Sequence, residues 1–145
     1  MARLVVINRV SKAVHFPRAA VSALLSRAEK VWPQKLQGKS IAVALVSTAE
    51  SKRLNQAHRG QNKATNVLSF ASAADGELGD IIICHEVAAS EAKIAGLKVK
   101  ERLEYLFIHG LLHLLGFDHQ SSRQTKNFAQ AEFRLGFKTQ FLTRH

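Results

Sequence analysis

The most apolar stretch of the chain covers residues 105–115, in which every residue except His109 and His113 is apolar or glycine. A helix that is apolar on nearly all sides is typical of a buried position. Because the two histidines are four residues apart, they lie one above the other on the same face. Gly116 follows the last leucine and predicts a left-handed residue that ends the helix and reverses the chain. The pattern therefore predicts a buried central helix that begins near Lys100.

Four shorter apolar runs are rich in β-branched residues and bounded by turn-forming residues, which predicts strands. These runs are residues 3–10, 40–46, 67–70 and 80–84. Apolar positions at helical spacing predict four further helices over residues 17–31, 51–59, 86–96 and 122–135. The turn-rich segment between the last two strands favours an antiparallel pair. We expect one α+β domain over residues 1–145, with a small mixed sheet of about four strands covered by about five helices.

Three histidines are candidates for a metal site on the central helix. A reversal at Gly116 would bring His119 back toward His109 and His113, so that three imidazoles converge. Buried polar groups without partners cost roughly 1–3 kcal/mol each, and a divalent metal ion would satisfy them directly. Zinc with three protein ligands and one open position for water is the usual arrangement in hydrolytic sites. We therefore expect one zinc ion per chain, bound by His109, His113 and His119.

The spacing HxxxHxxGxxH resembles the HExxHxxGxxH motif of the metzincin proteases. Gly110, however, occupies the position of the glutamate that serves those proteases as general base. Their Met-turn is also missing, because Met1 is the only methionine of the chain. The sequence thus predicts the metal scaffold without the protease machinery.

Positive charge is in excess, with 21 lysine and arginine residues against 11 aspartate and glutamate residues and a formal net charge of +10. The basic residues gather before residue 40, between residues 52 and 63, and after His119, which favours a nucleic-acid partner. No run of 18 apolar residues occurs, and the apolar N-terminal stretch is too short for a signal peptide, so we expect no membrane span. The single cysteine, Cys84, suits a reducing compartment, and we expect a cytoplasmic protein.

Three segments together resemble the YbeY family, the single-strand-specific endoribonucleases also called rRNA maturation factors. The segments are LNQAHRG, then TNVLSF followed by LGDIII, and then HGLLHLLGFDH. The resemblance implies a zinc-dependent endoribonuclease that acts on single-stranded RNA in rRNA maturation and ribosome quality control. It also implies the ribosome or ribosome-associated proteins as partners. It places the family's functional arginine at Arg59 and its zinc ligands at His109, His113 and His119.

The chain departs from the family pattern at three positions. Asn66 stands where the family usually has aspartate, and Ala64 and Ala71 stand where it usually has proline. If that aspartate acts through its charge, the electrostatics of the site are altered in this chain. If it caps or orients the loop, the amide oxygen of Asn66 can do the same.

The remaining candidates concern the chemistry of RNA cleavage. Arg59 is the candidate for binding a phosphate through two parallel hydrogen bonds. We assign no general base, because Asp118 is expected to orient the turn or a ligand histidine, and Asp80 is equally suited to cap its own loop. His58 and His85 lie at the ends of predicted elements and are expected to be surface residues.

Two other functions stay open at this point. One is a zinc hydrolase that acts on a peptide or a phosphoester, and the other is a ribosome-binding factor with a structural zinc. A closed fourth ligand would favour the structural zinc, whereas an open position would favour an enzyme. Tyr105, Phe117 and Trp32 could stack on bases, but core packing is the better expectation for each. No motif in the sequence indicates where RNA would be cleaved or which oligomeric state the protein has.

Overall fold

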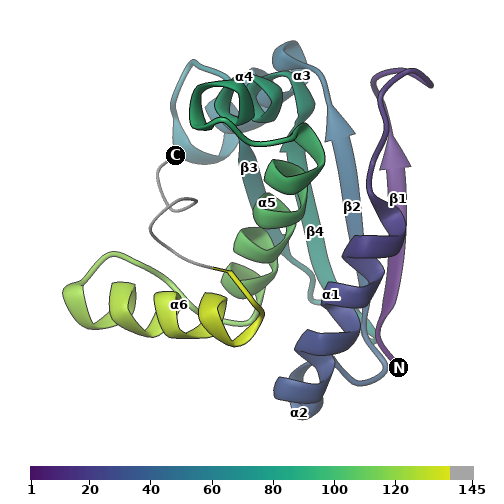
Figure 1. The fold of residues 1–145 in the computed structure, drawn as a ribbon, viewed down its shortest axis with the longest axis vertical. Coiled ribbons are helices and arrows are strands. Elements are labelled where there is room, and N and C mark those ends of the chain that lie inside the picture. The colour runs from purple at the N-terminus through teal and green to yellow at the C-terminus, as the bar shows by residue number, and fades with distance from the viewer. Residues whose placement is uncertain (138–145) are drawn as a thin grey trace.

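The computed structural model describes residues 1–137, which form a mixed four-stranded sheet packed against helices. The strands are β1 (Arg3–Asn8), β2 (Ser40–Val46), β3 (Val67–Ala71) and β4 (Glu77–Cys84). The helices are α1 (Arg18–Val31), α2 (Pro33–Leu36), α3 (Thr48–Arg59), α4 (His85–Ala95), α5 (Val99–Leu114) and α6 (Ser122–Arg134). Figure 1 shows α1 and α5 on one side of the sheet and α6 reaching away from the end of α5. The predicted α+β architecture is confirmed.

Two differences from the expected elements have physical causes. Residues 1–137 contain six helices rather than five, because the one-turn helix α2 begins at Pro33, whose fixed φ suits the first turn of a helix. Strand β4 begins at Glu77, three residues earlier than expected, because Glu77 pairs with Ser40 of β2. Such pairing depends on a distant segment and has no local signal in the sequence.

The strands follow the spatial order β1-β2-β4-β3. The pairs β1/β2 and β2/β4 are parallel, whereas β3 and β4 are antiparallel, as the turn-rich segment between them predicted. Parallel neighbours bring the ends of β2 and β4 to one edge of the sheet, where α3 and α4 begin. Helix α3 starts after Ser47, whose hydroxyl accepts a hydrogen bond from the Glu50 amide and caps the helix.

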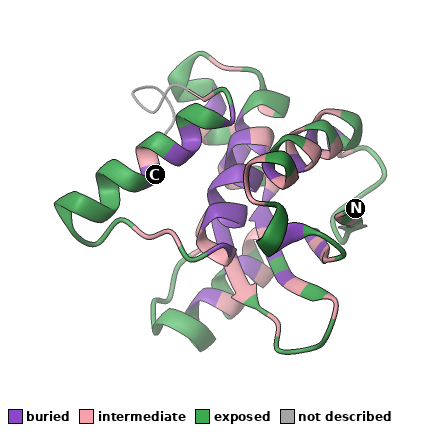
Figure 2. Cartoon of the chain, turned by 90° about the horizontal axis from the view of Figure 1, so that it is seen from below, coloured by how far each residue is buried: buried purple, intermediate pink, exposed green. Residues whose placement is uncertain are grey.

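The central helix α5 is buried along most of its length and packs against β3 and β4 (Figure 2). It approaches the sheet closely at Gly110. A Cβ atom at this position would lie 2.7 Å from Cγ2 of Ile81 and 3.0 Å from the hydroxyl oxygen of Ser69. That hydroxyl donates a hydrogen bond of 2.9 Å to the Gly110 carbonyl. Glycine at position 110 therefore sets the distance between the helix and the sheet.

We expect Gly110→Ala to lower the free energy of unfolding by about 1–2 kcal/mol. Overpacking costs about 1–3 kcal/mol, which exceeds the gain of up to about 1 kcal/mol in helix propensity. Urea denaturation measures the change. In an Ile81→Ala background, where the clashing methyl group is absent, the same substitution should cost much less. A Gly110→Ala protein as stable as the wild type would contradict the close approach.

Within residues 1–137, none of the helices combines the length and the apolar character needed to span a bilayer.

Candidate metal centre and its pocket

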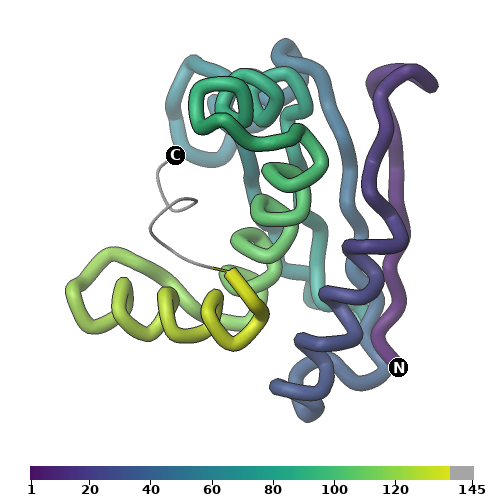
Figure 3. Tube along the Cα trace, in the orientation of Figure 1, coloured from purple at the N-terminus to yellow at the C-terminus, as the bar shows by residue number. Residues whose placement is uncertain are grey.

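The C-terminal end of α5 carries two of the three predicted metal ligands and turns the chain toward the third. Gly116 has φ of 100°, in the left-handed region that favours glycine. The amide of Phe117 donates to the Leu112 carbonyl and that of Gly116 to the His113 carbonyl, both at 3.0 Å. This pair of bonds ends the helix as the sequence predicted. In the tube of Figure 3 the chain leaves α5, turns and enters α6, and His119 lies in this connection.

The structure brings His109, His113 and His119 together. One ring nitrogen from each lies within 4.8 Å of the other two, and the Nε2 atoms of His109 and His113 are 3.2 Å apart. His109 is buried, His113 is half-buried and His119 is exposed, so the group is open to solvent on one side. The three residues could hold a metal ion.

Helix α6 supports this histidine group through Phe128. Its ring centroid lies 5.0, 5.2 and 5.5 Å from those of His109, His113 and His119, respectively. Phe128 is buried and comes from a different element than any of the histidines. The group is therefore fixed by α5, by the connection after it and by α6.

The chemistry of the donor set fits zinc. Imidazole nitrogens are usual zinc ligands, and they bind metal in the neutral form. Burial lowers the pKa of His113 below the usual value of an imidazole, and nearby positive charge from His119 and Arg59 lowers this pKa further. The environment of His113 thus favours its neutral, ligating form.

A pocket of about 510 Å³ opens beside the histidines. Besides the three histidines, its lining residues are Arg59, Gln61, Lys63, Thr65, Asn66, Val67, Ser69, Asp118 and Gln120. The structure therefore brings Arg59 into the same pocket as the histidine group, although 50 residues separate Arg59 from His109 in the sequence. Arg59 and Lys63 make one wall of the pocket positively charged, which suits a phosphate.

The loop between α3 and β3 is held in place by side chains of α3. The Ser51 hydroxyl donates to the Thr65 carbonyl at 2.8 Å and accepts from the Thr65 amide at 2.9 Å. The Asn55 side chain donates to the Lys63 carbonyl at 2.9 Å. Both Ser51 and Asn55 are buried. These bonds fix the wall of the pocket that carries Lys63 and Thr65.

Asn66 lines the pocket, but its amide is bonded within the protein. Its Oδ1 accepts a hydrogen bond of 2.7 Å from the Val67 amide, and its Nδ2 donates to both carboxylate oxygens of Glu91 at 3.2 Å. Glu91 also forms an ion pair with the buried Arg102 at 3.0 Å. In this chain, Asn66 therefore orients the start of β3.

The two candidate acids lie in different places. Asp118 lines the pocket, and its carboxylate accepts a hydrogen bond of 2.8 Å from the His119 amide, so that it orients the turn. Among residues 1–137, Asp118 is the one carboxylate in the pocket lining. Asp80 lies on the other face of the sheet, since its neighbour Ile81 faces Gly110 of α5.

The other residues considered from the sequence lie outside the pocket lining. His58 is exposed and packs on Phe70, with ring centroids 4.2 Å apart, while His85 is partly buried at the start of α4. Tyr105 is fully buried in the core. Trp32 and Phe117 pack against the core and meet edge to face, as expected for core packing.

Six pocket residues were not recognised from the sequence as site residues: Gln61, Lys63, Thr65, Val67, Ser69 and Gln120. The available signal was the polar segment that follows Arg59 directly. A loop that begins at a candidate phosphate ligand starts beside the bound group, so its first residues were candidates for the pocket lining. No local pattern in the sequence distinguishes Gln120 from other exposed polar residues.

The chain matches the family model described as Endoribonuclease YbeY over residues 7–138. The curated protein Endoribonuclease YbeY of Janthinobacterium sp. (strain Marseille) is 32% identical over 146 residues, covering 93% of this chain and 96% of the relative. The relative of the same name from Aromatoleum aromaticum is 36% identical over 132 residues, covering 89% and 83%. The match to the Bdellovibrio bacteriovorus relative is shorter and spans 63% of that protein, at 36% identity.

Among solved structures, the chain is similar to the solution structure of TM1509 from Thermotoga maritima. The TM-score is 0.58 at 26% sequence identity, and the similarity covers 93% of this chain and 89% of the other.

Proposed function

Since the chain belongs to the YbeY endoribonuclease family, we propose that it is a zinc-dependent endoribonuclease that cleaves single-stranded RNA. The observation that carries this proposal is the convergence of three histidines at the side of a positively charged pocket. Its substrate is ribosomal RNA, and its cellular task is rRNA maturation and ribosome quality control in the cytoplasm. The ribosome or ribosome-associated proteins are its partners.

The ligand number favours an enzyme over a structural metal site. Within residues 1–137 the histidine group has three members, and the pocket opens directly beside it. A structural zinc site is closed by a fourth protein ligand, whereas a hydrolytic site has three and an open position. A bound zinc ion would supply Lewis acidity and a water molecule of lowered pKa.

The residues of the pocket supply the rest of the chemistry. Arg59 binds a phosphate oxygen pair through its planar guanidinium and stabilises the negative charge that develops at phosphorus. Lys63 adds a second positive charge on the same wall. Asp118 holds the turn that presents His119 through its bond to the His119 amide. The preference for single strands follows from the concave site, since a flexible strand can bend its backbone into a pocket whereas a paired one loses base pairs in doing so.

The test is incubation of zinc-loaded protein with single-stranded RNA, duplex RNA and casein side by side. We expect cleavage of the single-stranded RNA alone, its loss on chelation and its recovery when zinc is added back. Cleavage of casein would identify a hydrolase of another substrate. A zinc-loaded protein that binds RNA and cleaves none of the three would identify a binding factor with a structural metal.

A further inference from the structure

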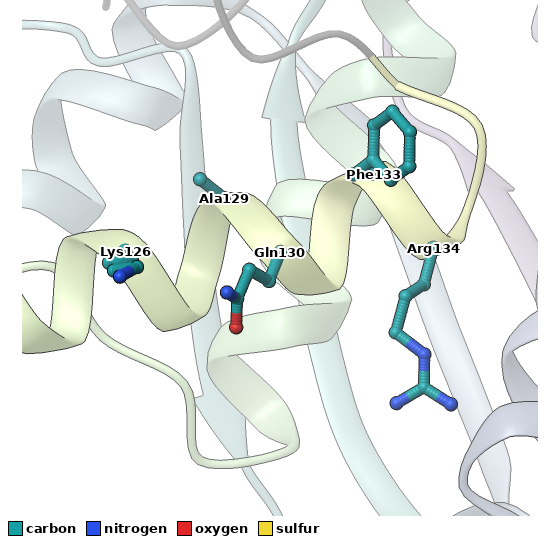
Figure 4. Close-up of a pocket in the computed structure, with 5 residues that line it drawn as sticks. All are labelled: Lys126, Ala129, Gln130, Phe133 and Arg134. Atoms are coloured by element: carbon teal, nitrogen blue, oxygen red, sulfur yellow. The ribbon is translucent and has the colours of Figure 1, made fainter.

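The outward side of α6 combines an exposed aromatic ring with positive charge. Phe133 is 73% exposed, and it lies in a hollow with Lys126, Ala129, Gln130 and Arg134 (Figure 4). We call Lys126, Ala129, Gln130 and Phe133 the α6 stripe. Their spacing of three to four residues places them on one side of the helix. The opposite side, with Phe128 and Leu135, is buried in the core.

The exposed charged side chains of α6 are all positive. Arg123, Lys126 and Arg134 are exposed, and the single acidic residue of the helix, Glu132, is fully buried. Burial raises the pKa of Glu132 to about 7, and the carboxyl group is not part of the exposed surface of α6. The exposed surface of α6 therefore presents three cations and no carboxylate.

The α6 stripe lies on the outward side of the helix whose inward side packs against the histidine group. Phe128, which packs against all three histidines, belongs to the same helix and precedes Phe133 by five residues. At 1.5 Å per residue this is about 7.5 Å along the helix axis. A nucleic-acid strand that leaves the pocket past His119 and Gln120 reaches the start of α6 first, near Arg123. Phe133 lies ten residues after Arg123, about 15 Å further along the helix axis.

We propose that the α6 stripe is an accessory binding surface for single-stranded RNA, in which Phe133 stacks on a base outside the metal pocket while Lys126 and Arg123 contact phosphates. This inference rests on the proposed function, because it extends the path of the same substrate. Aromatic side chains combined with cations are the general means of binding single strands without sequence preference.

Other occupants fit the α6 stripe less well. A second copy of this chain would bring like-charged surfaces together, which is unfavourable. A protein partner would need acidic groups around an apolar contact. Binding of such a partner and binding of RNA can be distinguished at position 133. Apolar packing accepts any side chain of similar size at position 133, whereas stacking on a base requires a ring.

The experiment compares the affinities of two single-stranded DNA oligonucleotides, about 4 and about 16 nucleotides long. DNA serves as the uncleaved probe, because stacking and phosphate contacts need no 2′-hydroxyl. The variants are Phe133→Ala, Phe133→Leu, Phe133→Tyr and Lys126→Ala in the full chain. Ile94→Ala and Lys93→Ala on α4 are matched controls, since Ile94 is 87% exposed and Lys93 is exposed beside it. Thermal melting checks that every variant is folded.

We expect Phe133→Ala and Phe133→Leu to weaken binding of the longer strand about tenfold, and Phe133→Tyr to restore it. Binding of the shorter strand should not change. Lys126→Ala should reduce the magnitude of the slope of log affinity against log salt by about one, which corresponds to the loss of one phosphate contact. Unchanged binding of the longer strand by Phe133→Ala, an equal loss in Ile94→Ala, or full binding by Phe133→Leu would overturn the proposal.

Cleavage of a short RNA separates this inference from the proposed function. Phe133→Ala should cleave an RNA of about 4 nucleotides at the wild-type rate, because such a strand ends before it reaches Phe133. A wild-type protein that cleaves no RNA would refute the proposed function, whereas the DNA affinities would still decide the role of the α6 stripe.

Discussion

Replacement of His113 by alanine is expected to remove the metal and to slow RNA cleavage by more than about a thousandfold. The Lewis acidity of a catalytic metal lowers the activation barrier by several kcal/mol, and about 4 kcal/mol corresponds to a thousandfold in rate. His113 is half-buried, and its Nε2 atom lies 3.2 Å from the Nε2 atom of His109. Loss of the His113 imidazole therefore leaves two of the three proposed ligands. Elemental analysis gives the zinc content, and single-turnover cleavage gives the rate.

His15→Ala is the matched control, since His15 is exposed and lies outside the histidine group and the pocket lining. It should retain one zinc ion per chain and the wild-type rate. Chelation of the wild-type protein should also lower its melting temperature, because the metal binds the folded state alone. A His113→Ala protein that retains stoichiometric zinc would show that the ligand set is wrong.

The second large effect is expected at Arg59, where Arg59→Ala should slow cleavage about 10²- to 10³-fold, as removal of one oxyanion donor does. Arg59 lies in the pocket with the three histidines and lowers the pKa of His113. If its guanidinium binds the phosphate more tightly as charge develops, its loss acts mainly on the transition state. Arg59→Lys should restore little activity, because an ammonium group cannot form the two parallel hydrogen bonds.

Single-turnover cleavage and RNA binding, measured on the same variants, separate catalysis from affinity. Arg53→Ala is the control, since Arg53 is exposed on the same helix and lies outside the pocket lining. It should cleave at nearly the wild-type rate. A folded, zinc-loaded Arg59→Ala protein with undiminished cleavage would show that another residue binds the phosphate.

Much of the fold could be predicted from the sequence, because apolar periodicity records which side of each element is buried. The central helix and the glycine stop at Gly116 carry this signal most strongly, and both occur in the structure. The start of β4 at Glu77 could not be predicted in this way. It depends on pairing with β2, which lies more than 30 residues earlier in the chain.

The candidate site was predictable to a different degree for each of its parts. The spacing of the histidines and the following glycine were sufficient to predict that three rings converge, because a helix and one tight turn determine their positions. The place of Arg59 beside them came from the family resemblance, since no local rule relates the end of α3 to the end of α5. The packing of Phe128 on all three histidines had no signal beyond an ordinary apolar position in α6.

The close approach of Gly110 to the sheet limits the evolutionary routes open to this scaffold. The histidine spacing is that of a metzincin protease, and on paper a single codon change to glutamate would complete the protease motif. In the structure the first carbon of any side chain at position 110 already meets Ile81 and Ser69. A glutamate there would require Ile81 or α5, which carries His109 and His113, to shift. Conversion of this fold to a protease therefore requires a compensating change at Ile81 or beside it as well as the glutamate, so that the two hydrolase chemistries are separated by more than one substitution.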